Sequence, residues 1–522
     1  MANQNRREFL AQTAALGGMT LPSPSATGDV AVGSKRPNLV YIFADQLRYF
    51  SCGYAGDEYA RTPHIDRLAA QGCNFHQAIS STPVCAPYRA SLFTGKYQSS
   101  TGMVINELRL SPEHECLGHV LTRKKYRTAY IGKWHLWANE LGHHELTRNA
   151  FVPPGPYRLG FDGLWQAYNF NHEYYNSPYF ENDTDRHIRK QYEPDGQTDV
   201  AIRFLEEAGK ANEPFALFVS WGPPHDPWDQ KNVRPDDLEL FNNITLPKRP
   251  NYSDTPDPYA DQWARIGKEY PNQVDQFQRT YYAQSAGIDR CVGRIMDALD
   301  NQGLAENTIL VFTSDHGEMF GAHGRRAKYI FYEEAARIPF LVRWPGHIPA
   351  KAVSDALLGT PDIMPTLLSL MNLPIPKSVE GVDLSGHAFG RSGAAPEAAH
   401  LQGMGTTAAW TDGTEWRATR DHEHTYAIYR RDGRELLFHN RTDPYQMRDL
   451  AGDRSSGPTL KHYREISEKW RKEQNDTFEA CTWYRDRWTR DRNITSTARS
   501  TGQDLHALSA MLKRWYPNGQ AN

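Results

Sequence analysis

The stretch that decides the fold is Pro37-Asn38-Leu39-Val40-Tyr41-Ile42-Phe43-Ala44-Asp45. A continuous apolar run that ends in a carboxylate is typical of a strand buried on both faces of a parallel sheet. Similar short runs, rich in β-branched and aromatic residues, occur at 128–131, 215–220, 308–313 and 340–342. These segments predict the strands of one sheet.

Helical patterns lie between the predicted strands, at 62–71, 197–208, 276–302 and 362–370. This alternation predicts an α/β fold with helices on both faces of the sheet. Polar residues follow four of the strands, namely Asp45, Lys133, His225 and Asp315. Because functional groups gather at the carboxyl ends of strands in such sheets, we expect these side chains to converge on one crevice.

The pattern changes beyond about residue 400. Asp-Gly pairs, which favour tight turns, occur at 412–413 and 432–433, and alternating segments occupy 426–429 and 435–438. They predict a small antiparallel sheet, followed by a helix over 459–475 and a tail over 476–522 that wraps the main domain. We therefore expect a catalytic domain at 35–400 and a C-terminal subdomain with its tail at 401–522.

The composition excludes several classes of protein. The chain has 522 residues and a net charge of -3, so no basic excess favours nucleic acid as a partner. No apolar run reaches about 18 residues, so no stable membrane insertion is expected of the mature protein. The 6 cysteines form no CxxC pair, so neither a zinc ribbon nor a disulfide framework is predicted.

The N-terminus has the character of an export signal. Asn5-Arg6-Arg7-Glu8-Phe9-Leu10 precedes a mildly apolar, Ala- and Gly-rich run at 11–21 and a Pro/Ser stretch to residue 26. This order resembles a bacterial twin-arginine (Tat) signal over 1–27 and implies a periplasmic or extracellular protein. The alternative is a tail that contains two arginines by coincidence.

Cys85-Ala86-Pro87-Tyr88-Arg89 is the most informative short motif, and it continues into Leu92-Phe93-Thr94-Gly95. On its own, Cys85 could be a small buried residue at the start of a helix. A cysteine with proline at +2, arginine at +4 and this tail resembles the modification motif of the formylglycine-dependent sulfatases. The resemblance implies that a formylglycine-generating enzyme oxidises Cys85 to an aldehyde before folding, and that the aldehyde hydrate is the nucleophile.

Two strand-end pairs could hold a metal ion, Asp45-Gln46 and Asp315-His316. Carboxylate and amide oxygens with an imidazole suit a divalent cation, although a single strand-end Asp more often caps a helix. Lys133-Trp134-His135 places a lysine and a histidine on the same side of an extended segment, so both could reach one anion. The alternative is a solvated lysine beside a core tryptophan.

His225 lies in a loop that prolines make rigid, which suits a general acid. A single loop histidine, like the downstream Lys328, is more often a solvated residue without a catalytic role. The order and spacing of all these segments, from residue 38 to about 450, resemble the type I sulfatases of the alkaline phosphatase superfamily. That resemblance implies a mixed sheet sandwiched by helices, a smaller C-terminal antiparallel sheet with a helix, and sulfuric ester hydrolysis.

The resemblance also assigns roles. One divalent cation, usually calcium, would be held by Asp45, Gln46, Asp315 and His316. Arg89 would stabilise the nucleophile formed from Cys85, and Lys133 and Lys328 would grip the sulfuryl oxygens. His225 would protonate the leaving alcohol, and His135 would take a proton from the remaining hydroxyl to release sulfate.

The sequence departs from the family pattern at three positions. Gln46 stands where an aspartate is usual and His316 where asparagine is frequent, so the site carries one negative charge fewer and manganese is an alternative ion. Related phosphonate monoester hydrolases also carry an Asp-Gln pair, which makes phosphonate or phosphodiester hydrolysis the alternative activity. Tyr88 replaces the small residue usual in the modification motif.

The segment 165–175 is rich in aromatic and amide side chains, which a sugar-binding wall needs, although these rings could equally belong to the core. We predict Trp137, Tyr168 and His172 as substrate-binding residues and sulfated carbohydrate, polymer or fragment, as the substrate. If Cys85 is never oxidised, the alternative is a non-catalytic carbohydrate-binding protein.

Overall fold

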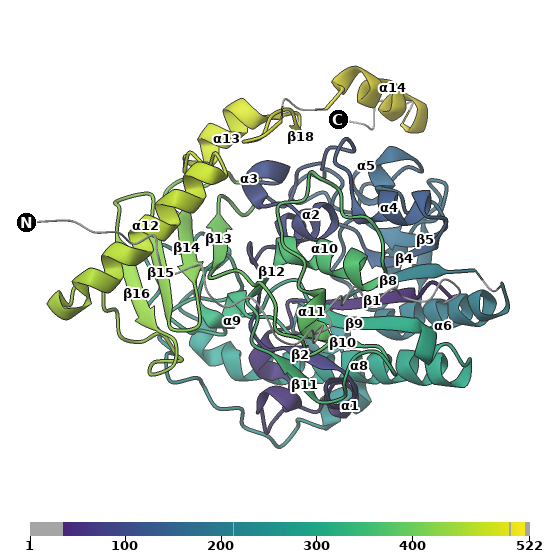
Figure 1. Cartoon of the computed structure of the whole chain (residues 1–522), viewed down its shortest axis with the longest axis horizontal. Coiled ribbons are helices and arrows are strands. Elements are labelled where there is room, and N and C mark those ends of the chain that lie inside the picture. Colours follow the sequence, from purple (N-terminus) through teal and green to yellow (C-terminus); the bar gives the residue numbers. More distant parts are fainter. Residues whose placement is uncertain (1–34, 212, 501–502, 517–522) are drawn as a thin grey trace, which may run out of the picture. The chain divides into compact units, whose positions relative to one another are not determined.

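The computed structural model describes residues 35–211, 213–500 and 503–516 (Figure 1). The predicted export signal at 1–27 lies outside these ranges. Residues from Pro37 onward form one compact unit.

A mixed sheet forms the centre of this unit. Its strands lie in the order β11 (Ala352–Ser354), β2 (Cys73–Phe75), β10 (Phe340–Arg343), β9 (Thr308–Ser314), β1 (Asn38–Asp45), β8 (Phe215–Pro224), β4 (Arg127–Lys133) and β5 (Leu164–Tyr168). Strand β1 is buried along its whole length and pairs in parallel with β8 and β9. Strand β10 runs antiparallel to both β9 and β2. The predicted α/β class is therefore confirmed.

Helices cover both faces of the sheet (Figure 1). Val40, Ile42 and Ala44 of β1 belong to a core cluster shared with α1 (Pro63–Gln71), α6 (Glu193–Ala211) and α8 (Tyr270–Asn301). The alternate residues of β1 pack in a second cluster with α2 (Cys85–Thr94), α4 (Leu117–Arg123) and α10 (Thr360–Leu370). Because successive side chains of a strand point to opposite faces, one apolar run serves two cores.

The C-terminal part contains a four-stranded antiparallel sheet in chain order, β13 (Ala399–Gly403), β14 (Trp416–Arg420), β15 (His424–Tyr429) and β16 (Glu435–His439). Asp432-Gly433 forms the turn between β15 and β16, and Gly433 has a φ of 68°, a conformation that favours glycine. Helix α12 (Gly457–Glu473) packs against β14. The predicted small sheet with its helix is confirmed.

Polar contacts join this sheet to the large domain. Arg420 of β14 donates to Glu333 Oε1 at 3.0 Å, and both side chains are buried. Gln402 of β13 accepts a hydrogen bond from the backbone N–H of Ser99 at 3.2 Å and donates to Asp476 at 2.7 Å. Buried polar contacts therefore join the small sheet to α3 (Gln98–Thr101) and α9 (Glu333–Ala336) of the large domain and to the C-terminal tail.

The tail beyond α12 contains α13 (Cys481–Trp488), β17 (Thr489–Arg490), β18 (Asn493–Ile494) and α14 (Leu505–Trp515). The Ala498 N–H donates to the Ser99 carbonyl at 3.0 Å, and the Tyr516 hydroxyl donates to the Phe151 carbonyl at 3.1 Å. These contacts place the tail against the large domain.

The remaining elements are short: α3 (Gln98–Thr101), α5 (Thr147–Ala150), α7 (Pro235–Glu239), α9 (Glu333–Ala336), α11 (Ser385–Ala388), β3 (Ala78–Ile79), β6 (Ser177–Tyr179), β7 (His187–Arg189) and β12 (Leu358–Gly359). All 6 cysteines are buried free thiols. Among the described helices, none is both long enough and apolar enough to cross a membrane.

Candidate active site

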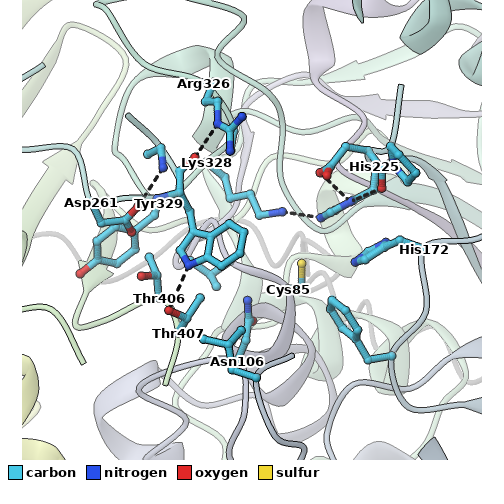
Figure 2. A pocket seen from close by; sticks show the side chains of 18 of the residues that line it. Cys85, Asn106, His172, His225, Asp261, Arg326, Lys328, Tyr329, Thr406 and Thr407 are labelled. Atoms are coloured by element: carbon cyan, nitrogen blue, oxygen red, sulfur yellow. Dashed lines mark hydrogen bonds and ion pairs between the residues drawn. The ribbon is translucent and has the colours of Figure 1, made fainter. Parts of the chain in front are cut away.

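The carboxyl ends of the central strands face a cavity of about 540 Å³ (Figure 2). Its lining includes Cys85, His172, His225 and Lys328. The first of these comes from the start of α2, and the others come from loops that follow strands. The crevice predicted from the strand ends is therefore present.

Register explains why two acidic residues meet beneath this cavity. Ala44 of β1 pairs with Ser314 of β9, so the next residue of each strand, Asp45 and Asp315, reaches the same sheet edge. The Gln46 N–H donates to Asp315 Oδ1 at 2.9 Å and closes the connection between the two strand ends. Burial and the neighbouring Asp45 raise the pKa of Asp315.

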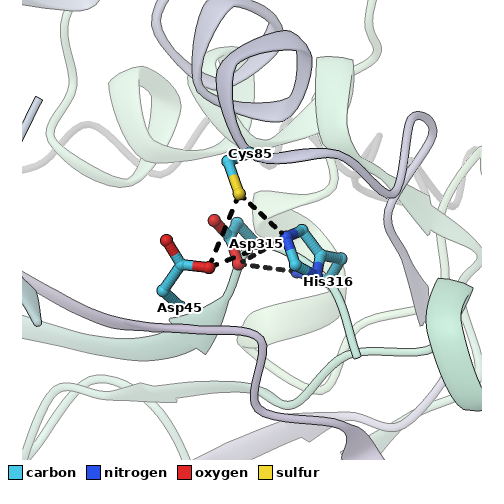
Figure 3. Close-up of side chains that lie close together, drawn as sticks. All are labelled: Asp45, Cys85, Asp315 and His316. Atoms are coloured by element: carbon cyan, nitrogen blue, oxygen red, sulfur yellow. Dashed lines mark hydrogen bonds and ion pairs between the residues drawn. The ribbon is translucent and has the colours of Figure 1, made fainter. Parts of the chain in front are cut away.

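Four side chains form a compact cluster of possible metal ligands: Asp45, Cys85, Asp315 and His316 (Figure 3). Their candidate ligand atoms lie within 4.8 Å of one another, and all four residues are buried. His316 Nδ1 lies 3.1 Å from the Gly317 carbonyl, which can only accept, so the Nε2 lone pair faces the cluster. Two carboxylates and an imidazole that lacks a proton on this nitrogen suit a divalent cation.

Gln46, the fourth ligand expected from the sequence, follows Asp45 in a left-handed backbone conformation, with a φ of 69°. Its Oε1 accepts a hydrogen bond from Lys328 Nζ at 2.5 Å, and its Nε2 donates to Glu318 Oε2 at 2.6 Å. Glu318 Oε1 accepts two further N–H groups, from Phe320 and Ala327. Glu318 thus fixes which end of the Gln46 amide faces the cation site.

Cys85 is the first residue of α2, and Arg89 lies one turn later on the same helix face. The Cys85 Sγ is 3.6 Å from Asp45 Oδ1 and 3.2 Å from His316 Nε2. Burial acts against ionisation of Cys85, but the charges of Lys133 and Lys328 outweigh it and hold its pKa well below the usual range. The position is therefore one at which a negative charge is stabilised.

Arg89 is buried among partners that hold its guanidinium in place. Its Nη1 donates to the Lys133 carbonyl at 2.7 Å and to Ser220 Oγ at 2.8 Å. Its Nη2 lies 3.4 Å from carboxylate oxygens of both Asp45 and Asp315. Arg89 therefore neutralises part of the acidic cluster as well as facing residue 85.

Lys133 Nζ donates to Asp45 Oδ2 at 2.6 Å, and both side chains are fully buried. His135, two residues on, is fully buried and has a left-handed backbone conformation with a φ of 56°. Among the residues that the structure describes, neither of its ring nitrogens has a hydrogen-bond partner, and burial, with the charge of Lys133, lowers its pKa to about 3. His135 is therefore a neutral imidazole at physiological pH.

His225 has partners at both ring nitrogens. Its Nδ1 lies 2.9 Å from the Asp226 carbonyl and 3.0 Å from Asp226 Oδ1, while its Nε2 lies 2.7 Å from Lys328 Nζ. Burial and Lys328 oppose protonation, but the carboxylates of Asp226 and Asp45 outweigh them and raise the pKa of His225 to about 9. The proton on Nδ1 is held by Asp226, and the contact with Lys328 holds the ring at the cavity.

The three predicted substrate-binding residues have different locations. His172 lines the cavity, and its ring stacks on that of His225 with 3.9 Å between centroids. Tyr168 is 1% exposed and donates its hydroxyl to Glu193, while Trp137 is fully buried and donates its indole N–H to the Arg148 carbonyl. These two rings pack in the core because their strand and loop direct them away from the cavity, so they do not line it.

The sequence analysis missed several residues of the site. Glu318 lies two residues after His316 but has no predicted role, and its partner Gln46 lies 272 positions away in the chain. Trp263 and Arg326 also line the cavity, although the sequence around them carries no motif. Only the three-dimensional arrangement identifies them.

The comparison with family models gives two matches. Residues 37–373 match the model of the family described as sulfatase. Residues 321–474 match the model described as the C-terminal part of N-sulphoglucosamine sulphohydrolase. The first match covers the central sheet and every side chain of the site described above.

Relatives with assigned activities are similar over most of their length. The chain is 37% identical over 421 residues to an ulvan-active sulfatase of Formosa agariphila. This aligned region covers 80% of this chain and 77% of the relative. It is 30% identical over 531 residues to an endo-4-O-sulfatase of Bacteroides thetaiotaomicron. That aligned region covers 91% of this chain and 99% of the relative.

Solved structures share the fold. One from work on glycosaminoglycan metabolism by Bacteroides thetaiotaomicron has a TM-score of 0.73 at 27% identity and covers 86% of this chain and 98% of its own. The phosphonate monoester hydrolase of Agrobacterium radiobacter has a TM-score of 0.62 at 21% identity, with 84% and 96% covered. The second likeness shows the fold alone.

Proposed function

This chain belongs to the sulfatase family and is a sulfuric ester hydrolase, and we propose that it removes sulfate from carbohydrates with a formylglycine made from Cys85. The observation that carries the proposal is the position of residue 85. It lines the cavity at the start of α2, within 3.6 Å of Asp45 and His316, and the charges of Lys133 and Lys328 favour an anion there. A nucleophile that attacks a sulfuryl group needs this combination of access and charge neutralisation.

The modified residue and one divalent cation would supply the chemistry that the unmodified chain lacks. As an aldehyde hydrate, residue 85 provides a hydroxyl nucleophile, and a bound cation favours the deprotonated form of such a hydroxyl. The residues that would hold the cation are Asp45, Gln46, Asp315 and His316. Calcium suits the oxygen donors, and manganese is the alternative because His316 contributes nitrogen.

The chain's own cations would bind the sulfate group. The ammonium groups of Lys133 and Lys328 both stabilise a negative charge at residue 85, and Arg89 follows it by one turn on α2. Arg89 and Lys133 are buried, Lys328 is partly buried, and hydrogen bonds hold all three, so they stabilise negative charge with little reorganisation. Their placement favours an ester that carries negative charge on its non-bridging oxygens.

Two histidines would move protons at different stages. The raised pKa of His225, about 9, favours its protonated form, which suits the donor to the leaving alcohol. Its Nε2 lies 2.7 Å from the Lys328 ammonium, so this nitrogen would carry the proton once Lys328 has turned from it to the sulfate group. The lowered pKa of His135, about 3, keeps it unprotonated, which suits the acceptor of the hydroxyl proton when sulfate is released. One fold thus holds an acid and a base at the same pH.

Carbohydrate is the proposed substrate class because the named activities of the relatives concern ulvan and sugar O-sulfates. The cavity also presents Phe170, His172 and Trp263, whose flat rings suit stacking on sugar faces. The twin-arginine sequence at the N-terminus supports export, with modification of Cys85 by a formylglycine-generating enzyme in the cytoplasm before the folded protein is exported.

Mass spectrometry of the protein from its own host tests the nucleophile. The tryptic peptide 68–89 also contains Cys73, so fragmentation must localise any change to position 85. We expect a residue about 18 Da lighter than cysteine at position 85 and an unchanged Cys73. Cys85→Ala should then lose turnover while its circular dichroism and thermal unfolding stay the same.

The same preparation separates the alternatives. We expect faster hydrolysis of an aryl sulfate than of an aryl phosphonate; the reverse order would favour the phosphonate hydrolase reading. An intact thiol at position 85, together with no turnover, would favour a carbohydrate-binding protein. A Cys85→Ala protein with a rate near that of the wild type would eliminate the proposed mechanism.

A further inference from the structure

One wall of the cavity carries a flat ring and a positive charge that the proposed reaction does not use. Trp263 and Arg326 both line the cavity, and Figure 2 shows Arg326 at its wall. Trp263 is 45% exposed. They contact each other directly, because Arg326 Nε donates to the Trp263 carbonyl at 2.8 Å. The Arg326 N–H also donates to the Ala264 carbonyl at 2.8 Å.

Arg326 forms no salt bridge within the described part of the chain, although its charge contributes to the lowered pKa of Asp226 on the same cavity. The Nε contact is the only hydrogen bond found there for its guanidinium, and no carboxylate lies within 4.0 Å of it. The two Nη groups therefore remain available, and the Nε anchor fixes their direction. A fixed planar fork with free N–H groups matches the geometry of a carboxylate or a sulfate.

The carboxylates that line the cavity are engaged elsewhere. Asp226 pairs with His225, and Asp229 accepts the Lys231 N–H at 2.9 Å. Asp261 Oδ1 accepts the N–H groups of residues 263 and 264, both at 2.8 Å. Glu107 accepts the N–H of residue 408 at 2.7 Å, and burial raises its pKa to about 8. Arg326 is thus not directly paired with any of these carboxylates, and it lies in a concave, partly desolvated site.

Lys328 provides the contrast. It lines the same cavity, but its ammonium is held by Gln46 and His225 beside residue 85. The sulfate group that is hydrolysed can therefore be bound by the cations beside residue 85, without Arg326. An additional, differently placed cation indicates an additional anionic group on the ligand.

The neighbouring ring is fixed as firmly as the guanidinium. The Trp263 indole N–H donates to Thr407 Oγ1 at 3.2 Å, and the turn made by Asp261 holds its backbone. A half-exposed indole with a fixed plane suits stacking on the apolar face of a sugar ring. A ring stacked there would present its substituents to Arg326.

We propose that Trp263 and Arg326 form a subsite for a sugar residue that carries a second anionic group, a carboxylate or a sulfate, in addition to the sulfate removed. This inference rests on the proposed function and narrows it, because the preferred substrate is then an acidic oligosaccharide with at least two anionic groups. Arg326 acts as a specificity residue and takes no part in the bond cleavage.

The test compares Arg326→Gln with the wild type on four substrates. These are an aryl sulfate, a sulfated disaccharide with a uronic acid, the same disaccharide with its carboxyl reduced to an alcohol, and a disulfated disaccharide without uronic acid. We expect kcat/KM to fall about 10- to 100-fold, mainly through KM, on the substrates with a second anion. The aryl sulfate and the carboxyl-reduced disaccharide should change by less than about twofold.

The pattern across the substrates identifies the second anion. A loss restricted to the uronic acid substrate assigns a carboxylate, and a loss restricted to the disulfated one assigns a sulfate. Arg326→Lys should recover only part of the loss, because lysine lacks the fork. Arg490→Gln serves as the control for net charge, because its side chain is 76% exposed and outside the cavity lining. Equal losses on all four substrates, or none on any, would overturn the proposal.

A binding measurement keeps this inference separate from the proposed function. Calorimetry with a sulfate-free, uronate-containing disaccharide and with a sulfated disaccharide analogue that resists hydrolysis tests the subsite without turnover. If no sulfate ester is hydrolysed but Arg326→Gln weakens this binding, the proposed function fails and the subsite stands. If sulfate esters are hydrolysed and neither binding nor KM depends on Arg326, the subsite fails and the proposed function stands.

Discussion

The buried carboxylate of Glu318 determines the orientation of the Gln46 side-chain amide. Glu318 Oε2 accepts the Gln46 amide N–H at 2.6 Å, and Glu318 Oε1 is already occupied by two backbone N–H groups. The Gln46 oxygen is thereby turned toward Lys328 and the cluster of ligands. An amide that flipped would present its NH₂ group there, and a cation cannot bind an N–H donor.

Glu318→Gln should therefore weaken cation binding although it changes few atoms. The backbone N–H groups of Phe320 and Ala327 would still bind the oxygen of the new glutamine side chain, so its NH₂ group would face Gln46. Because two NH₂ groups cannot hydrogen-bond to each other, the Gln46 amide would then rotate to present its oxygen. We expect the Kd for Ca²⁺ to rise about 10- to 100-fold, as is usual when a group that orients a metal ligand is removed. Calorimetric titration of metal-free protein measures this directly.

Glu468→Gln, on the exposed face of α12, makes the same chemical change far from the site in sequence and should leave the Kd unchanged. Asp45→Asn should weaken binding further, because it removes a charged ligand. An unaltered Kd in a folded Glu318→Gln protein would mean that Gln46 keeps its orientation without Glu318.

Among individual residues, the polar side chains that directly follow strands could be predicted from the sequence. Asp45 and Asp315 could be found because apolar runs end at them and parallel strands share an edge. Trp137 and Tyr168 could not be placed, because an aromatic residue near a strand end packs in the core or lines a cavity according to its side-chain direction. The role proposed for Arg326 could not be predicted, because whether an arginine has a salt-bridge partner depends on its neighbours in the folded protein.

At the scale of elements, helix α1 depends on a residue from another helix. Its N-cap residue Thr62 makes no side-chain cap hydrogen bond. Asp289 of α8 instead accepts the N–H groups of His64 and Ile65, at 2.9 and 2.7 Å. Burial raises the pKa of Asp289 to about 7, against the opposing effect of these two hydrogen bonds.

This raised pKa gives a predicted pH dependence of stability. Between about pH 4 and pH 7 the folded protein holds the Asp289 proton more tightly than the unfolded chain does, so stability falls as pH rises through this window. Asp289→Asn keeps an acceptor for the helix N–H groups but cannot ionise. The stability of the wild type relative to this variant should fall by up to about 1.4 kcal/mol per pH unit.

Urea unfolding of both proteins at pH 5, 6, 7 and 8 measures the difference. Other groups that titrate in this range contribute equally to both proteins and cancel. Parallel stability curves for the two proteins would contradict the assignment of a raised pKa to Asp289.

The sequence predicted most elements but not all of their ends. The apolar run predicts a strand over 215–220, whereas the residues that follow include Pro223-Pro224, which cannot donate to a sheet. The strand continues to Pro224, which pairs with Asp45 after an irregularity in register. Helix α8 begins at Tyr270 rather than 276, with a proline in its first turn, where a missing N–H has no consequence.

At the scale of the whole molecule, the sequence predicted two sheets but not how they are joined. Buried contacts such as Arg420 with Glu333, and Gln402 with Ser99 and Asp476, connect segments that are far apart in the chain. No local pattern marks such pairs, because each partner alone resembles an ordinary polar residue. The same holds for the tail, whose contacts with Ser99 and Phe151 follow no motif.

The cation site should link metal binding to the stability of the whole fold. Asp45 and Asp315 come from adjacent strands at the centre of the main sheet, and both are fully buried. Arg89 and Lys133 neutralise them only in part, since the pKa of Asp315 remains raised. A divalent cation at this position would stabilise the strand ends that carry both carboxylates.

Calcium in about 100-fold excess over its Kd should therefore stabilise the folded state by about 2.7 kcal/mol, because the unfolded chain has no such site. For a domain of this size we expect the Tm to rise by a few degrees and to return when a chelator is added. Scanning calorimetry of metal-free and calcium-loaded protein measures the shift, and Asp315→Asn should abolish most of it. An identical Tm in both states of the wild type would show that the cluster holds no calcium, whereas a shift with manganese alone would identify manganese as the ion.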